Sequence, residues 1–105
     1  MGVIKGVLKE ELKNSLHMKS DYERELASLP KGSLIKKTIK GHEYYYLLLR
    51  EDDKVKFIYK GKVSEEEIEK YREAKEYRAK YRKLLSQVKK QIRFLRSALR
   101  GKESV

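Results

Sequence analysis

A long basic run near the C-terminus is the strongest chemical feature of this sequence. No acidic residue occurs from Tyr77 to Lys102, whereas the preceding segment carries Glu65, Glu66 and Glu67. Lysine and arginine bind phosphates as point charges without special spacing, so the run predicts a polyanion ligand but no sequence specificity. The alternative is a solvated helix face. The candidate phosphate-binding residues are Arg78, Arg82, Lys83, Lys89, Lys90, Arg93, Arg96 and Arg100.

A second candidate surface lies in the middle of the chain, where tyrosines and basic residues alternate. Aromatic rings can stack on nucleic-acid bases or enter a groove while neighbouring cations hold phosphates. The alternative is that these tyrosines pack beneath a helix or against a second subunit. The candidate binding residues here are Lys36, Tyr44, Tyr46, Arg50, Lys54, Lys56 and Lys60.

Few residues could catalyse a reaction or hold a metal. His17 and Asp21 are one helical turn apart, a spacing that can orient an imidazole, but no nucleophile is placed near them. His42 and the carboxylates of residues 51–53 belong to turns, where adjacent carboxylates seldom converge on one ion. The chain has no cysteine. We therefore predict a protein that is not an enzyme and has no metal site and no cofactor.

The spacing of apolar residues predicts an α+β fold. Apolar residues repeat every three or four positions at the start of the chain, which predicts a helix over about residues 4–28 that ends before Pro30. The next segment, about 33–61, has the two-residue period of three strands separated by turns. We expect these strands to form an antiparallel meander.

A long second helix is predicted to follow the strands. Ser64 and Glu67 form a capping box at its start, and the helix is expected over about 65–100, where Gly101 stops it. Residues 102–105 are then a free tail. With 105 residues, the whole chain is expected to be one domain.

Alternation along each strand predicts two faces for the sheet. We expect the helix-facing side to combine Tyr45, Leu47 and Leu49 with Val55, Phe57 and Tyr59. We expect the other side to combine Tyr44, Tyr46, Leu48 and Arg50 with Lys54, Lys56, Ile58 and Lys60.

The long helix carries a heptad seam. Apolar residues recur in alternating steps of four and three, as in a coiled coil, although Arg78 interrupts the frame upstream. The charges of the first helix sum to zero, so we interpret it as a packing element that covers part of the seam as an antiparallel partner. The remainder predicts a homodimer. The seam consists of Leu85, Val88, Ile92, Leu95 and Leu99.

The composition limits where the protein can act. The net charge is +11 and 41% of the residues are charged, but eight tyrosines and regular apolar spacing favour a folded chain. The longest apolar run, Tyr44–Leu49, is too short for a membrane span or a signal peptide. We therefore expect a cytoplasmic protein that does not bind membranes.

The central motifs resemble those of a known family. Leu29-Pro30-Lys31-Gly32-Ser33, then Tyr44-Tyr45-Tyr46-Leu47 and later Tyr59 resemble a family of small uncharacterised prokaryotic proteins associated with transposons and phages. The resemblance covers roughly residues 29–100. Many members carry a cysteine cluster between the first two strands, where this chain has Gly41-His42-Glu43, so no metal site is implied.

The order of elements is also similar to that of the arm-binding domain of tyrosine recombinases, which lays a three-stranded sheet in the DNA major groove. That similarity implies groove-facing positions at Lys36, Tyr44, Tyr46, Lys56 and Ile58. An alike order of elements argues for a fold more than for a function.

Two functions follow as hypotheses. The first is a dimeric, non-enzymatic nucleic-acid-binding protein of a mobile element, which contacts DNA or RNA through the basic helix and the sheet. The second is a protein-interaction module, such as a phage-borne inhibitor or adaptor that docks on a nucleic-acid enzyme.

Overall fold

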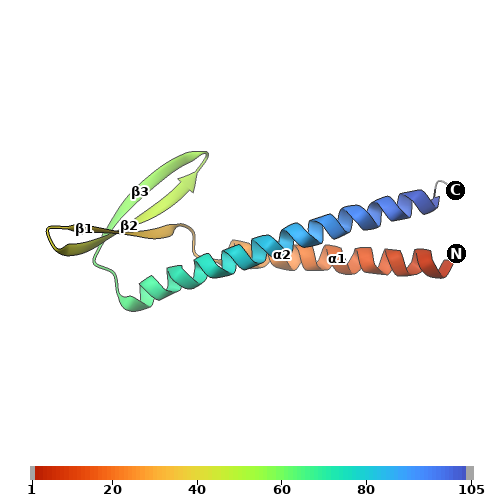
Figure 1. The fold of residues 1–105 in the computed structure, drawn as a ribbon, viewed down its shortest axis with the longest axis horizontal. Helices are drawn as coiled ribbons and strands as arrows, with labels where there is room; N and C mark the ends of the chain where they lie inside the picture. The colour runs from red at the N-terminus through yellow and green to blue at the C-terminus, as the bar shows by residue number, and fades with distance from the viewer. Residues whose placement is uncertain (1, 104–105) are drawn as a thin grey trace. The chain divides into compact units, whose positions relative to one another are not determined.

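The computed structural model describes residues 2–103, which form a helix, three strands and a second helix (Figure 1). The bounds are α1 Gly2–Ser28, β1 Ser33–Ile39, β2 His42–Glu51, β3 Lys54–Gly61 and α2 Glu65–Glu103. The predicted α+β class is confirmed. The predicted helix end is wrong, because Gly101 keeps helical geometry instead of forming a left-handed cap, and α2 continues to Glu103. Of the predicted tail, residues 104–105 lie outside the described residues.

The chain divides into two compact units. The first unit joins α1 to α2 from Ala79 onward, and the second contains residues 29–78, which include the sheet and the start of α2. Within the first unit, α1 runs beside the second half of α2 in the opposite direction (Figure 1). Because α2 belongs to both units, the expectation of one folded domain stays a prediction.

The start of α2 has the serine half of the predicted capping box. The backbone N–H of Glu67 donates to Ser64 Oγ at 3.2 Å, and the N–H of Ile68 donates to the Ser64 carbonyl at 3.0 Å. The serine hydroxyl thereby satisfies one of the backbone donors that a helix start leaves open.

The seam of α2 is buried within a single chain. Val88, Ile92, Leu95 and Leu99 are buried, and Leu85 is half-buried. The facing stripe of α1 also repeats in steps of three and four, and its ring of Tyr22 lies 6.1 Å from that of Tyr81. The α1 stripe covers the seam, so these residues need no second chain, and the homodimer itself stays a prediction. The stripe consists of Lys5, Leu8, Leu12, Ser15, Lys19, Tyr22 and Leu26.

The meander is held by two tight turns. β1 pairs with β2 and β2 with β3, both antiparallel, so β2 is the central strand. Lys40 and Gly41 both have positive φ, as do Asp52 and Asp53, which is the backbone of a two-residue hairpin turn with the twist that strands favour. Aspartate tolerates this left-handed conformation, so turn chemistry accounts for the Asp52–Asp53 pair.

The register overturns the predicted composition of both sheet faces. Tyr46 pairs with Tyr59 and Ile35, and Leu48 pairs with Phe57, so these residues share one face. Alternation shows which residues of one strand share a side, but only the register shows which side of the next strand joins them.

The expected partners are therefore exchanged between the faces. Val55, Phe57 and Tyr59 lie on the side of Tyr44 and Tyr46, and not with Leu47. Lys36, Lys54, Lys56 and Ile58 lie on the side of Tyr45, Leu47 and Leu49. The register also shifts between Tyr45 and Tyr46, where Lys60 is the extra residue of a bulge on β3.

Close packing at Gly32 anchors the sheet to the loop before it. Gly32 has a φ of 94°, and a Cβ there would lie 2.8 Å from the Leu48 carbonyl oxygen and 2.9 Å from Leu47 Cδ1. Only glycine combines this dihedral with this approach. Leu47 is accordingly the buried residue of the sheet, as its alternation predicted.

Among residues 2–103, neither helix combines the length and the apolar character that crossing a membrane would need. The same residues contain no group of three histidine, aspartate or glutamate side chains placed to hold a metal ion.

Candidate functional site

The exposed basic residues of α2 occupy a regular position relative to its seam. In the first unit, five of the six inward-facing residues are each followed directly by a lysine or an arginine. The residue directly after an inward-facing one lies about 100° further round the helix, so all such residues lie on the same side of α2. All five cations are exposed. They are Arg82, Lys89, Arg93, Arg96 and Arg100, after Tyr81, Val88, Ile92, Leu95 and Leu99.

Helix α1 adds cations to the same side. Leu8 and Leu12 of its stripe are followed by Lys9 and Lys13, both exposed. Because the two helices run in opposite directions with their seams facing, the residue after a seam position lies on the same side of the hairpin in both. Lys19, itself a stripe residue, lines a shallow hollow together with basic residues of α2. We call these eight residues the basic flank: Lys9, Lys13, Lys19, Arg82, Lys89, Arg93, Arg96 and Arg100.

The surface of the basic flank is shallowly hollowed along its length. One hollow is lined by Lys19, Ser86, Lys89, Ile92, Arg93 and Arg96. A second is lined by Arg93, Arg96, Leu99 and Arg100, so the two share a pair of arginines. A third, on α1, is lined by Lys9, Leu12, Lys13, Leu16, His17 and Ser20. Open, shallow hollows of this kind suit an extended ligand better than an enclosed small molecule.

One carboxylate shares the side of the basic flank, because Glu23 follows Tyr22 of the stripe. Among residues 2–103, the ion pairs of known geometry join Arg24 to Asp21, Lys36 to Glu43 and Arg72 to two glutamates, and none involves the basic flank. Four of its cations, Lys19, Lys89, Arg93 and Arg96, line one hollow. Like charges held this close repel, and a bound polyanion would relieve that repulsion.

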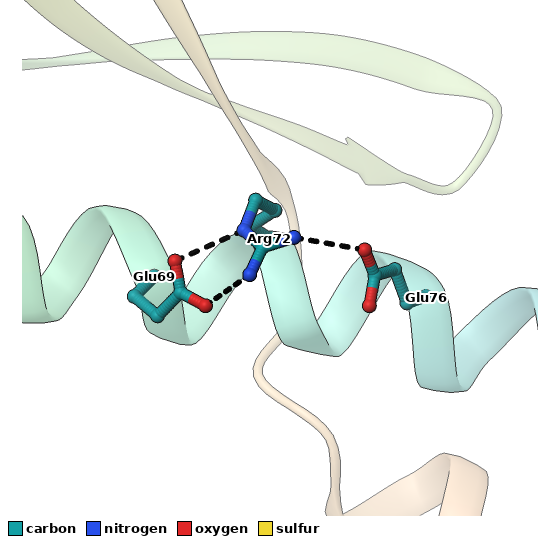
Figure 2. Close-up of polar contacts among 3 residues, drawn as sticks. All are labelled: Glu69, Arg72 and Glu76. Atoms are coloured by element: carbon teal, nitrogen blue, oxygen red, sulfur yellow. Dashed lines mark hydrogen bonds and ion pairs between the residues drawn. The ribbon is translucent and has the colours of Figure 1, made fainter.

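Arg72, nearer the start of α2, shows the opposite arrangement (Figure 2). Its Nε donates to Glu69 Oε2 at 2.9 Å and its Nη1 donates to Glu76 Oε1 at 3.0 Å, while Nη2 also bonds to Glu69. The hydrogen bond and the charge of Arg72 hold the pKa of Glu69 below its ordinary value. This part of α2 therefore balances its own charges, whereas the second half does not.

The other predicted cations of α2 are placed differently. Lys83 and Lys90 are exposed, but they lie on the outer side of α2, away from the seam. Arg78 is half-buried and its Nη2 donates to the Pro30 carbonyl at 2.7 Å. Arg78 therefore secures the loop after α1, which makes it a poorer phosphate ligand than the exposed arginines.

The predicted sheet residues are split between two faces. Tyr44, Tyr46 and Arg50 share one face, and Lys36, Lys54 and Lys56 lie on the other. Lys36 is also paired with Glu43 at 3.2 Å. The single surface of alternating tyrosines and lysines, expected from the sequence, is therefore not formed.

Sequence reasoning missed the α1 contribution to the basic flank. The charges of α1 were summed to zero, but its carboxylates are segregated from Lys9 and Lys13: Glu11 precedes a stripe residue and so lies on the opposite side. Asp21 and Glu25 also precede stripe residues, and Glu23, which shares the side of the basic flank, lies further along α1. The α1 cations could have been found from the sequence by noting where each charged residue stands relative to the apolar stripe.

The opposite side of the helical hairpin combines exposed apolar residues with polar ones such as Glu11 and Gln91. Residues that precede inward positions include Ile4 and Val7 of α1 and Phe94 and Ala98 of α2. Phe94 is 68% exposed and Val7 is 53% exposed. We call Ile4, Val7, Met18, Phe94 and Ala98 the apolar flank. Exposed apolar groups that gather on one side often mark a protein contact.

A comparison with known protein families gives a match over most of the chain's first two thirds. Residues 9–70, more than half of the 105-residue chain, match the model of a family described as a domain of unknown function, DUF6788. The match includes most of α1, the whole sheet and the start of α2, and it ends before the basic half of α2. No curated protein and no solved structure matches the chain. The association with mobile elements and the similarity to recombinase arm-binding domains stay predictions.

Proposed function

We propose that this chain, which belongs to the DUF6788 family, is a non-enzymatic nucleic-acid-binding protein whose basic flank holds the phosphates of DNA or RNA. The observation that carries the proposal is the placement of seven cations on one side of a two-helix hairpin, with Lys19 of the stripe in the same hollow as three of them. A basic surface formed only for solubility needs no such segregation. The predicted origin in a mobile element and the cytoplasmic location belong to this proposal as well.

The physical mechanism is electrostatic. Each phosphate that a lysine or arginine neutralises releases condensed counterions, so affinity falls steeply with salt. A helix pair can present its side chains along a phosphate backbone without reading bases, and the flank contains no grouping that would specify a sequence.

Affinity for duplex DNA and for structured RNA, measured between about 50 and 200 mM salt, tests the proposal. Replacing Arg93 and Arg96 by glutamine should lower the salt slope by about two units, because two phosphate contacts are lost. Replacing Lys83 and Lys90, which lie on the outer side of the same helix, is the matched control with the same loss of charge. Absence of binding at the lowest salt, or equal effects of the two variants, would contradict the proposal.

The predicted homodimer finds its best support in the apolar flank. Because the α2 seam is covered by α1, a second chain would have to contact Ile4, Val7 and Phe94, and both basic flanks would then stay exposed. Sedimentation should report a dimer that Phe94→Glu converts to a monomer with unchanged thermal stability. A monomeric wild-type protein would contradict the homodimer.

The apolar flank also favours a second candidate function, the protein-interaction module. A partner of this kind would cover the apolar flank and not the basic one. Such a partner becomes the better explanation if the wild-type chain is monomeric and binds neither DNA nor RNA at low salt.

A further inference from the structure

The sheet of the second unit presents an exposed aromatic surface on one side. The register pairs Tyr46 of β2 with Tyr59 of β3 and Leu48 with Phe57, and Tyr44 lies on the same side of β2. Phe57 is 58% exposed and Tyr59 is 60% exposed, whereas Tyr44 and Tyr46 are half-buried. We define the aromatic face as Lys37, Tyr44, Tyr46, Arg50, Phe57 and Tyr59.

The rings of this face support one another. The Tyr46 and Tyr59 rings meet edge to face at 5.4 Å, and the Tyr44 ring lies 6.3 Å from that of Tyr59. The Lys37 Nζ lies over the Tyr46 ring, 5.0 Å from its centre. Edge-to-face pairs and cation–π contacts hold aromatic side chains in defined orientations. The Tyr59 ring is therefore held in a defined orientation while much of its surface remains in contact with water, and Phe57 adds a second exposed ring on the same side.

The charges of the aromatic face have one sign. Lys37 and Arg50 are exposed, and no carboxylate of the three strands shares this side. Glu43 and Glu51 pair with Thr38 and Lys54 on the opposite side. An anionic ligand with flat apolar groups is therefore complementary to this face in both charge and shape.

We propose that the aromatic face binds unpaired bases of a single-stranded nucleic acid, an inference that rests on the proposed function. The rings of Phe57 and Tyr59 would stack on bases, and Lys37 and Arg50 would hold the flanking phosphates. Every base has a π-face, so stacking of this kind tolerates many sequences. Bases within a duplex are already stacked on each other and cannot occupy these rings.

A second copy of the chain fits this face less well. A symmetric dimer brings the same patch of both copies together. Lys37 and Arg50 would then face their own counterparts across an interface with no carboxylate from this side of the sheet. Nucleic acid supplies the missing negative charge, and a second copy does not.

Fluorescence anisotropy with labelled single-stranded and duplex oligonucleotides of equal length tests the proposal. In the variant Phe57→Ala with Tyr59→Ala, affinity for the single strand should fall by about 5- to 100-fold per stacked ring, while duplex affinity stays within about twofold. The variant Phe57→Tyr with Tyr59→Phe keeps both rings and should keep the affinity. Ile58→Ala, on the opposite side of the same strand, is the matched control and should bind as the parent does.

Three results would overturn the inference: unchanged single-strand affinity in the double alanine variant, equal losses for both ligands, or an equal loss in the Ile58→Ala control. Circular dichroism and thermal melting confirm that each variant is folded, and the ring-keeping variant separates stacking from packing. Sedimentation of the same variants tests whether the aromatic face joins two copies: a dimer that is present in the parent and lost in the double alanine variant would also overturn the inference. If only the single-strand proposal is wrong, the chain still binds duplex DNA with the expected salt dependence. If the proposed function is wrong, the chain does not bind duplex DNA either.

Discussion

The guanidinium of Arg78 donates a hydrogen bond to the carbonyl of Pro30 at 2.7 Å, across 48 residues of sequence. Arg78 stands at an inward position of α2, where the seam would otherwise have an apolar residue. The position is half-buried, so the charge keeps partial contact with water while one donor satisfies the loop carbonyl. This contact explains why an arginine interrupts the heptad frame.

Replacing Arg78 by alanine should therefore lower the free energy of unfolding by about 1.5–3 kcal/mol, the range for hydrogen bonds that involve a charged group. Chemical denaturation measures the change. Arg82→Ala removes the same side chain from an exposed position one turn later, and it should alter stability by less than about 0.5 kcal/mol. Equal effects of the two variants would show that the Pro30 contact contributes nothing.

The segment boundaries could be read from the sequence because each depends on local chemistry. Ser64 begins α2 by capping, and the change from a period of three or four to a period of two separates the first helix from the strands. The end of α2 could not be read in this way, because Gly101 can continue a helix as well as stop one.

The sheet faces could not be predicted because they depend on pairing across strands. The tight turns at Lys40–Gly41 and Asp52–Asp53, together with the bulge at Lys60, set a register in which Tyr46 meets Tyr59. A shift of one residue reverses every side chain. The α1 cations were missed for a different reason: a charge sum discards the position of each residue on the helix.

The lowered pKa of Glu69 predicts a specific pH response. The group is charged more readily in the folded chain, so its contribution to stability is present above the unfolded-state pKa and is lost as pH falls through the lower folded-state pKa. In the Arg72→Ala variant, the NMR titration midpoint of the Glu69 side chain should rise to the ordinary glutamate value. The parent chain, titrated under the same conditions, is the control, and an unmoved Glu69 midpoint would contradict the assignment.

The buried seam predicts a strong effect of Ile92→Asp on folding. The change removes a buried apolar side chain and places a charge between α1 and α2, so unfolding free energy should fall by more than about 3 kcal/mol. Ser97→Asp introduces the same carboxylate on the exposed outer side of α2 and should be nearly neutral. A stable Ile92→Asp monomer would instead indicate that the seam packs only between chains.

The position of Lys19 predicts that its replacement by an apolar residue will raise the stability of the chain and weaken its binding of nucleic acid. It occupies an inward position of the α1 stripe and lines the same hollow as Lys89, Arg93 and Arg96, so a positive charge is held among others beside apolar side chains. Lys19→Leu should extend the apolar stripe and remove that repulsion, which raises the melting temperature. The same change should weaken nucleic-acid binding and reduce the salt slope by about one unit. Lys13→Leu, at an exposed position outside the stripe, should reduce the salt slope to a similar extent without raising the melting temperature. If Lys19→Leu lowers the melting temperature, then Lys19 stabilises the hairpin, and its place in the stripe reflects folding and not the binding of phosphates.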